Sequence, residues 1–236
     1  MTETRTVSLA IPTFQREDLL FESFANVYDD PRISEIIIVD DASDLELFNR
    51  VKEKCDKLSK VRLFRNIFNI DCYRNKHRAF SFINNEYGIL LDSDNVITKE
   101  YLDAIYAIPE WNAKTILQPV FAKPAFDFRQ YSGLTLTKEN VAHYVDTNLM
   151  TSLNAMNFFI NRDEYLKVWD GSVDAGSSDS IYFSLCWLKA GNSILMTPNL
   201  HYDHRIHEDK SNHYSQNSHK YVEFHNQVMK EIKELK

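Results

Sequence analysis

A continuous apolar run, Ile36-Ile37-Ile38-Val39, constrains the fold of this chain more than any other feature. Such a β-branched run is typical of a central parallel strand that is buried on both faces. Three more strands are predicted in the first half, at Val7–Ile11, Val61–Phe64 and Gly88–Leu91, with Pro12 ending the first of them. Helical periodicity is expected between these strands, over 17–28, 45–58 and 78–85. This β-α-β-α-β-α-β order predicts an α/β fold: a Rossmann-like, mostly parallel central sheet flanked by helices, in a single domain.

The composition is that of an ordinary globular protein and excludes several function classes. The 236 residues carry a formal net charge of −7, which argues against a nucleic-acid partner. No apolar run approaches the length of an integral membrane segment, and the first residues contain no apolar signal region. Three widely spaced cysteines indicate reduced thiols. We expect a cytoplasmic protein, with peripheral association with a membrane left open.

The second half is less regular than the first. Strands are expected over 115–121, 157–161 and 193–196, and helices over 98–108, from Asp163, and over 180–189, where Gly191 is a good helix stop. Residues 123–152 show no clear period and are expected to form helix and loop around a pocket. The tail from Ser218 carries an apolar stripe at helical spacing, which more often packs on its own domain than on a partner.

Acidic residues follow two of the predicted parallel strands. Asp40 and Asp41 end one strand, and Asp92 and Asp94 come directly after another. Side chains at i and i+2 of an extended segment point the same way, so Asp92 and Asp94 could converge on Mg²⁺ or Mn²⁺. Ligands of open α/β sheets bind beyond the carboxyl ends of the strands, where both acidic pairs would lie. The plainer alternative is a strand that ends in solvated acids.

Several segments together resemble the family 2 glycosyltransferases, which have the GT-A fold. The resemblance covers roughly residues 5–200 and rests on motifs in the family's order: Val7–Arg16, which is similar to a strand ending in Pro-Thr-Tyr-Asn-Arg; Glu35–Ser43; Asn69–Asp71; Asn75–Ala79; Glu86–Asn95 with its D-x-D; and Asn157–Glu164. It implies a nucleotide-sugar-binding half over 1–97, an acceptor half over 98–200, and a C-terminal lid and helix over 201–236.

The activity that this resemblance implies is transfer of a sugar, with inversion, from a nucleotide-sugar to an acceptor hydroxyl. The donor would be a UDP-sugar, the acceptor a glycan or another hydroxyl compound, and the cofactor Mn²⁺ or Mg²⁺. Asp94 would be the direct metal ligand, with Asp92 beside it near the ribose and sugar, and Asp41 would accept from the N–H of the base ring. Lys76, or failing it Arg74, would face the phosphates, where the family usually has arginine. The full set implied for the nucleotide-sugar is Pro12, Thr13, Arg16, Asp41, Arg74, Lys76, Asp92 and Ser93.

A general base is the second requirement of this chemistry, because a carboxylate must take the acceptor's proton. The family's base belongs to an acidic pair at the start of a helix, whereas Gly176–Ser180 contains one acid, Asp179. Asp179 is therefore the candidate and Asp174 the reserve. The alternative is that Asp179 only caps the helix.

A cluster of histidines follows the last predicted strand. The resemblance implies a histidine metal ligand from this region, and His204 is preferred, then His207, then His201. A single histidine in such a place is more often a surface or packing residue.

Two other functions remain open from the sequence. One is a catalytically silent GT-A domain that binds nucleotide or glycan as a scaffold, which the single acid near Asp179 allows. The other is a sugar-phosphate nucleotidyltransferase, which the absence of a glycine-rich loop at Pro12–Arg16 disfavours. The donor sugar, the acceptor and the oligomeric state are not specified by the sequence.

Overall fold

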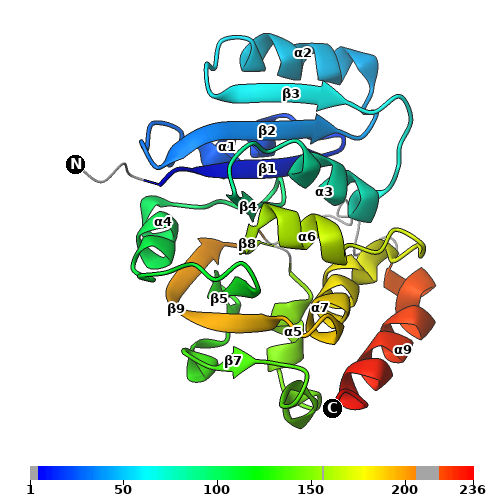
Figure 1. The fold of residues 1–236 in the computed structure, drawn as a ribbon. Helices are drawn as coiled ribbons and strands as arrows, with labels where there is room; N and C mark the ends of the chain where they lie inside the picture. The colour runs from blue at the N-terminus through cyan, green and yellow to red at the C-terminus, as the bar shows by residue number, and fades with distance from the viewer. Residues whose placement is uncertain (1–4, 156, 206–217) are drawn as a thin grey trace.

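The structure of the protein is a computed structural model that describes residues 5–155, 157–205 and 218–236 (Figure 1). The strands are β1 Val7–Thr13, β2 Ile33–Asp40, β3 Val61–Arg65, β4 Tyr87–Leu90, β5 Thr115–Lys123, β6 Phe126–Asp127, β7 Thr135–Leu136, β8 Phe159–Asn161 and β9 Ser193–Asp203. The α-helices are α1 Asp18–Ala25, α2 Leu45–Cys55, α3 Cys72–Ser81, α4 Lys99–Tyr106, α5 Leu149–Leu153, α6 Arg162–Val168, α7 Asp179–Lys189 and α9 Val222–Lys233. Short 3₁₀ turns are η1 Arg129–Tyr131, η2 Val141–Tyr144, η3 Gly176–Ser178 and η4 Ser218–Tyr221.

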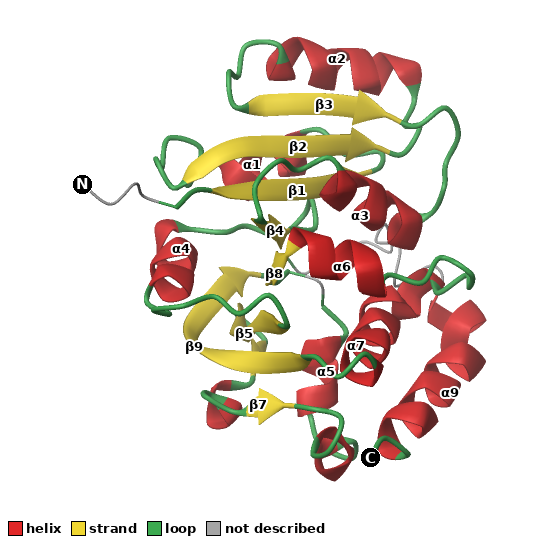
Figure 2. Cartoon of the chain, viewed as in Figure 1, coloured by secondary structure: helices red, strands yellow, loops and turns green. Residues whose placement is uncertain are grey.

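One mixed sheet runs through the molecule in the order β3-β2-β1-β4-β8-β5-β9-β7, with β6 beside β5 (Figure 2). The first four of these strands are parallel to one another, as predicted. Strand β8 lies antiparallel between β4 and β5, and β9 pairs in parallel with β5. The predicted fold class, an α/β domain with a central sheet between helices, is confirmed. The carboxyl ends of β1, β2 and β4 meet at one edge.

Helices cover both faces of this sheet. Along β2, Ile37 and Val39 belong to the core that also contains residues of α3, α6 and α7. Their neighbours Ile36 and Ile38 belong to the core that contains residues of α1, α2 and α4. All four side chains have no exposed surface, which explains why this strand is apolar at every position.

Strand β1 continues through Pro12 to Thr13, so the prediction that Pro12 ends the strand is wrong. The pairing with β2 covers both residues, and Asp41 N donates to Thr13 O at 2.8 Å. On the other side, β4 pairs with β1 only as far as Ala10. The imide nitrogen of Pro12 thus lies on the side where β4 has already ended, and its missing N–H leaves no gap in a ladder.

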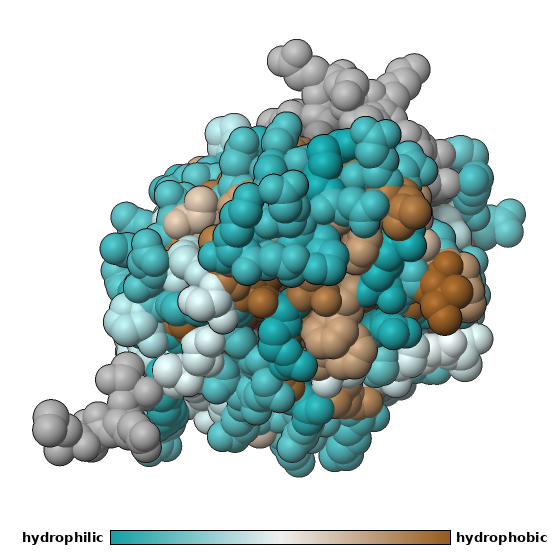
Figure 3. Space-filling view, turned by 90° about the horizontal axis from the view of Figure 1, so that it is seen from above, coloured by the Kyte–Doolittle hydropathy of each residue, from teal (hydrophilic) through white to brown (hydrophobic). Residues whose placement is uncertain are grey.

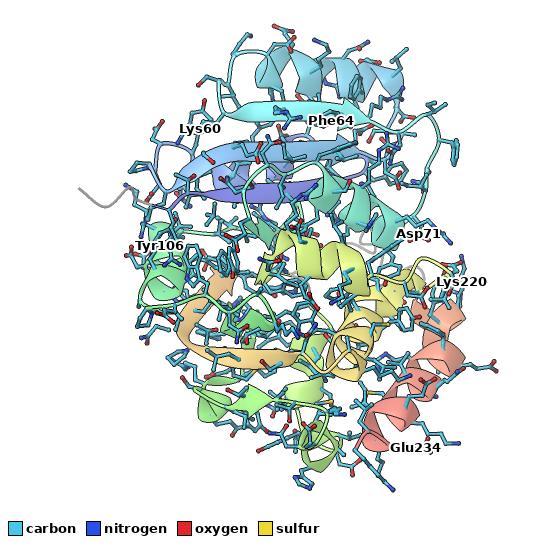
Figure 4. The ribbon with its side chains drawn as sticks, viewed as in Figure 1. Lys60, Phe64, Asp71, Tyr106, Lys220 and Glu234 are labelled. Atoms are coloured by element: carbon cyan, nitrogen blue, oxygen red, sulfur yellow. The ribbon has the colours of Figure 1, made fainter. Side chains whose placement is uncertain are left out.

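Helix α3 begins at Cys72, whereas the periodicity of the sequence predicted a helix only from Arg78. Asp71, labelled in Figure 4, has a positive φ of 76° and turns the chain into the helix. The inward face of α3 contains two polar residues, Asn75 and Lys76, both buried. Their polar character hides the helical periodicity of this segment. Arg74 and Lys76 therefore lie on a helix rather than in a loop.

The C-terminal stripe packs on its own domain, as expected. Val228 and Ile232 of α9 are buried in the same core as residues of α7. The opposite end of the molecule, which carries α2 and the edge strand β3, presents a mostly hydrophilic face (Figure 3). No helix of the described residues is long and apolar enough to cross a membrane. Residues 206–217 of the predicted C-terminal lid and helix, 201–236, lie outside the described residues.

Truncation of the central strand should destabilise the fold. We expect Ile37→Ala to lower the free energy of unfolding by about 2–5 kcal/mol, because it leaves a cavity in the core beneath α3. Ile67→Ala is the matched control: Ile67 is 96% exposed, against 0% for Ile37, and its loss should change stability by less than about 0.5 kcal/mol. Chemical denaturation measures both variants, and equal effects would contradict this assignment of the core.

Candidate active site

Asp41 lies directly after β2 in a pocket of neutral polar groups. Its Oδ1 accepts from Asn66 Nδ2 at 2.7 Å and from Ile70 N at 2.9 Å. The described residues donate no hydrogen bond to its Oδ2. Burial raises the pKa of this carboxyl, and the hydrogen bonds from Ile70 and Asn66 oppose that shift only in part. One oxygen of Asp41 is therefore held by the protein, and the other remains for a donor from a ligand.

Thr13 provides a second unused polar atom at this place. Its Oγ1 is buried and has no hydrogen-bond partner among the described residues. Pro12 precedes it at the end of β1, and the Thr13 carbonyl holds the backbone of Asp41. A buried hydroxyl without a partner is uncommon in proteins and is a candidate contact for a bound molecule.

Asp92 and Asp94 lie on a turn rather than on an extended segment. Strand β4 ends at Leu90, and Asn95 N donates to Asp92 O at 3.0 Å. The expectation that both side chains extend from a strand in the same direction is therefore wrong. Asn157, which lies just before β8, holds Asp92 through two hydrogen bonds. Its Oδ1 accepts from Asp92 N at 2.9 Å, and its Nδ2 donates to Asp92 Oδ2 at 3.2 Å.

Arg16 contacts the same turn from the loop that follows β1. Its Nη2 lies 2.9 Å from Asp94 Oδ2, and its Nη1 donates to Ser93 Oγ at 3.3 Å. The structure thus brings Arg16 and Ser93, both implied for the nucleotide-sugar, together with Asp94, the implied metal ligand. The side chain of Asp94 remains 15% exposed, so that one edge of the turn is open to a ligand.

Lys76 lies between two carboxylates from distant parts of the chain. Its Nζ is 2.8 Å from Asp179 Oδ2 and 3.2 Å from Asp92 Oδ1. Burial lowers the pKa of Lys76, but the charges of Asp179 and Asp92 outweigh it and raise the pKa well above its usual value. Burial also opposes the ionisation of Asp92, yet the charge of Lys76 keeps the pKa of Asp92 lowered. The ammonium group of Lys76 thus connects the two carboxyl groups. Arg74, on the same helix, has no ion pair with a described residue.

Asp179 is the first residue of α7, and Ser178 occupies the N-cap position without a side-chain cap bond. The alternative of Asp179 as a helix cap is therefore not what the structure shows. Its Oδ1 accepts from the backbone N and the Oγ of Ser180, at 2.6 and 2.9 Å. Asp174, the reserve, is exposed and accepts from Tyr221 Oη at 3.3 Å. Of the two candidate bases, only Asp179 contacts the other acids through Lys76.

The end of β9 reaches the turn that carries Asp94. Val96 and Asp203 pair through two backbone hydrogen bonds of 2.9 Å, and Arg205 Nε donates to Asp94 O at 3.2 Å. His204 lies between these contacts, with its ring centroid 5.2 Å from that of Phe126. His201 is turned back onto Asn199 O at 2.8 Å. His207 lies outside the described residues.

The donor atoms at this edge fit a hard divalent cation. Carboxylate oxygens of Asp92 and Asp94 are the ligands that Mg²⁺ and Mn²⁺ prefer. No group of three or more histidine, cysteine or acidic side chains within residues 5–155, 157–205 and 218–236 is placed to hold a metal. Magnesium sites in nucleotide-binding proteins need only one or two carboxylates, because the phosphates of the substrate and water complete the coordination.

Sequence reasoning missed the residues that hold these acids in place. Asn66 follows β3 directly, and its position after a third parallel strand was a usable signal. Asn157 was counted only as part of a strand motif. Arg205, which contacts both the backbone of Asp94 and the amide side chain of Asn95, had no signal apart from the nearby histidines.

The sequence was compared with models of protein families and with curated proteins. The sequence model of the family described as glycosyl transferase family 2 matches residues 8–172, which is more than half of the chain. No curated protein matches the sequence significantly.

Solved structures share the fold at low sequence identity. TarS 1–349 of S. aureus in complex with UDP-GlcNAc matches with a TM-score of 0.71 and 19% identity, over 96% of this chain and 65% of that one. The mannosyltransferase PcManGT from Pyrobaculum calidifontis, in complex with GDP-Man and Mn²⁺, matches with a TM-score of 0.65 and 14% identity, again over 96% and 65%. This chain therefore spans slightly less than two thirds of the length of either structure. By its family match and its GT-A type of fold, the chain belongs to glycosyl transferase family 2.

Proposed function

We propose that this protein transfers a sugar from a UDP-sugar to an acceptor hydroxyl of a glycan or another hydroxyl compound, with inversion and with the help of Mn²⁺ or Mg²⁺. The observation that carries the proposal is the gathering of Asp41, Asp92, Asp94 and Asp179 at one edge of the sheet from three separate segments. The reaction requires acidic side chains for three tasks: to bind the base of the nucleotide, to bind the cation, and to take the proton of the acceptor. We also propose a reducing, cytoplasmic setting, in which Cys55, Cys72 and Cys186 would remain thiols.

Asp41 favours uracil over guanine as the base of the donor. Uracil presents a single ring N–H, which one free carboxylate oxygen can accept. Guanine presents a ring N–H and an amino group side by side, which a carboxylate accepts best with both oxygens. Since Asn66 and Ile70 already occupy Oδ1, the pocket is better matched to uracil. The related structures include complexes with UDP-GlcNAc and with GDP-Man, so both bases occur on this fold.

The reacting groups divide between the two halves of the site. Asp94, with Asp92 beside it, would hold the divalent cation, which when bound neutralises the charge that develops on the leaving diphosphate. Arg16 adds a fixed positive charge at the same turn. On the opposite side, a carboxylate oxygen of Asp179 would take the proton of the acceptor hydroxyl as its oxygen attacks the sugar. Attack from the side opposite the leaving group inverts the sugar carbon.

Asp94→Ala should abolish metal-dependent binding of the nucleotide. The variant removes the carboxylate assigned as the direct metal ligand, so added Mn²⁺ should no longer strengthen UDP binding or raise the melting temperature with UDP. Asp163→Ala, which removes a carboxylate that is 83% exposed and far along the chain, is the control. Metal-dependent binding of normal strength in Asp94→Ala would exclude the metal role of this residue.

Asp179→Asn should separate binding from transfer. The amide keeps the size of the side chain but cannot take a proton, so transfer should fall by about 10²-fold or more while UDP affinity stays close to that of the wild type. Transfer is measured with a panel of UDP-sugars and Mn²⁺. Unchanged turnover would mean that another group is the base, and Asp174→Asn would then be examined. A wild-type protein that binds UDP but transfers nothing would instead favour the silent scaffold.

Asp41→Asn should reverse the preference for the base. Asn66 and Ile70 both donate to Oδ1, so they fix the amide with its oxygen toward them and its NH₂ toward the ligand. That NH₂ group would meet the ring N–H of uracil, which is also a donor. The corresponding ring nitrogen of cytosine carries no hydrogen and can accept from the NH₂ group. We expect UDP affinity to fall roughly 10- to 100-fold while CDP binds better than to the wild type. Calorimetry with both nucleotides measures the change, and equal losses for both would contradict this contact.

The same variant should be at least as stable as the wild type at pH 7. Because burial raises the pKa of Asp41, its contribution to stability is present at low pH and is lost as the pH rises through the folded-state pKa. Asn cannot ionise and escapes that loss. Denaturation of both proteins from pH 4 to pH 7 should show the advantage of Asn growing with pH, and an advantage that shrinks would contradict the assignment.

A further inference from the structure

The place of Lys76 does not suit a residue that meets the donor phosphates. Its side chain is 9% exposed, and its ammonium group lies between Asp179 and Asp92. An ammonium group has three protons, and two of them are directed at these carboxylates. Lys76 and Asp179 are 103 residues apart in the sequence, so that this contact joins the nucleotide half to the acceptor half.

We propose that Lys76 is a positioning residue, which holds the carboxylate of Asp179 in place as an ionised base and ties it to the donor-side acid Asp92. This inference rests on the proposed function, since it assigns a partner to the base of that reaction. Asp179 then has both oxygens fixed, Oδ1 by Ser180 and Oδ2 by Lys76. A base held from two sides keeps one orientation toward an entering hydroxyl.

The other titratable groups around Asp179 do not replace this charge. Cys72 and Tyr73 of α3 and Tyr165 of α6 are the neighbours that interact with it electrostatically. Burial raises the pKa of each of these three groups, so they are neutral near pH 7. Lys76 is the cation that forms an ion pair with Asp179 among the described residues. Its removal would leave a buried carboxylate with no compensating charge.

The test is Lys76→Met, with kinetics and donor binding measured separately. We expect kcat to fall by about 10²-fold, while the Kd for UDP with Mn²⁺ stays within about twofold. A lower kcat with an unchanged Kd distinguishes the loss of a positioned base from the loss of a donor contact. Arg78→Met, an exposed position on the same helix, is the matched control and should leave both quantities unchanged. Weaker UDP binding with normal kcat would overturn the proposal and return Lys76 to the phosphates.

A double variant guards against a simple failure to fold. Lys76→Met alone leaves two acids close together without their cation, whereas Lys76→Met combined with Asp179→Asn removes one of those charges as well. The double variant should be more stable than Lys76→Met, and denaturation of the four proteins of this cycle isolates the coupling between the two residues. Additive effects would overturn the pairing even if no variant were assayed for transfer.

The failure of this inference differs from the failure of the proposed function. A wild-type protein that transfers no sugar would remove the function and this role together. A wild-type protein that is active, with a Lys76→Met variant whose kcat matches it, would remove the role of Lys76 alone.

Discussion

One buried ammonium group, that of Lys76, holds together the part of the molecule where its two halves meet. Helix α3 belongs to the N-terminal half, whose strands are parallel, and α7 belongs to the C-terminal half. The Lys76–Asp179 ion pair joins these two helices at 2.8 Å, and Lys76 also pairs with Asp92 of its own half at 3.2 Å. Buried ion pairs seldom add much net stability, because desolvation offsets their attraction. They do penalise any arrangement in which one partner is missing. The contact therefore specifies where Asp179 lies more than it strengthens the fold.

The charges at this edge leave an excess of negative charge. Arg65 pairs with Asp40, Arg16 pairs with Asp94, and Lys76 is shared by Asp92 and Asp179. Asp41 has only neutral hydrogen-bond donors. A diphosphate that approaches such an edge is repelled unless a cation comes with it. The excess of acids is thus a physical reason for the proposed divalent metal that does not depend on any related protein.

The sequence predicted the sheet well and the contacts within the site poorly, for one physical reason. The apolar run at Ile36 reports burial on both faces, which is a local property of the strand. Strand β1 can continue through Pro12 because β4 ends early beside it, and the periodicity of α3 is hidden because Lys76 is polar and finds its partner far along the chain. The types of the site residues were predicted from strand ends and motifs. Their pairings were not, because an ion pair across 103 residues leaves no periodic signal in either segment.

Asp41 shows how the site and the stability of the fold oppose each other. A carboxylate placed among neutral donors at the end of a buried strand has its pKa raised, so that its ionised form costs stability at neutral pH. An asparagine at this position would keep both hydrogen bonds to the protein and avoid that cost. What it would lose is the second acceptor oxygen, to which no described residue donates a hydrogen bond. Selection for binding can retain a residue that is less favourable for folding when one of its atoms is available to a ligand.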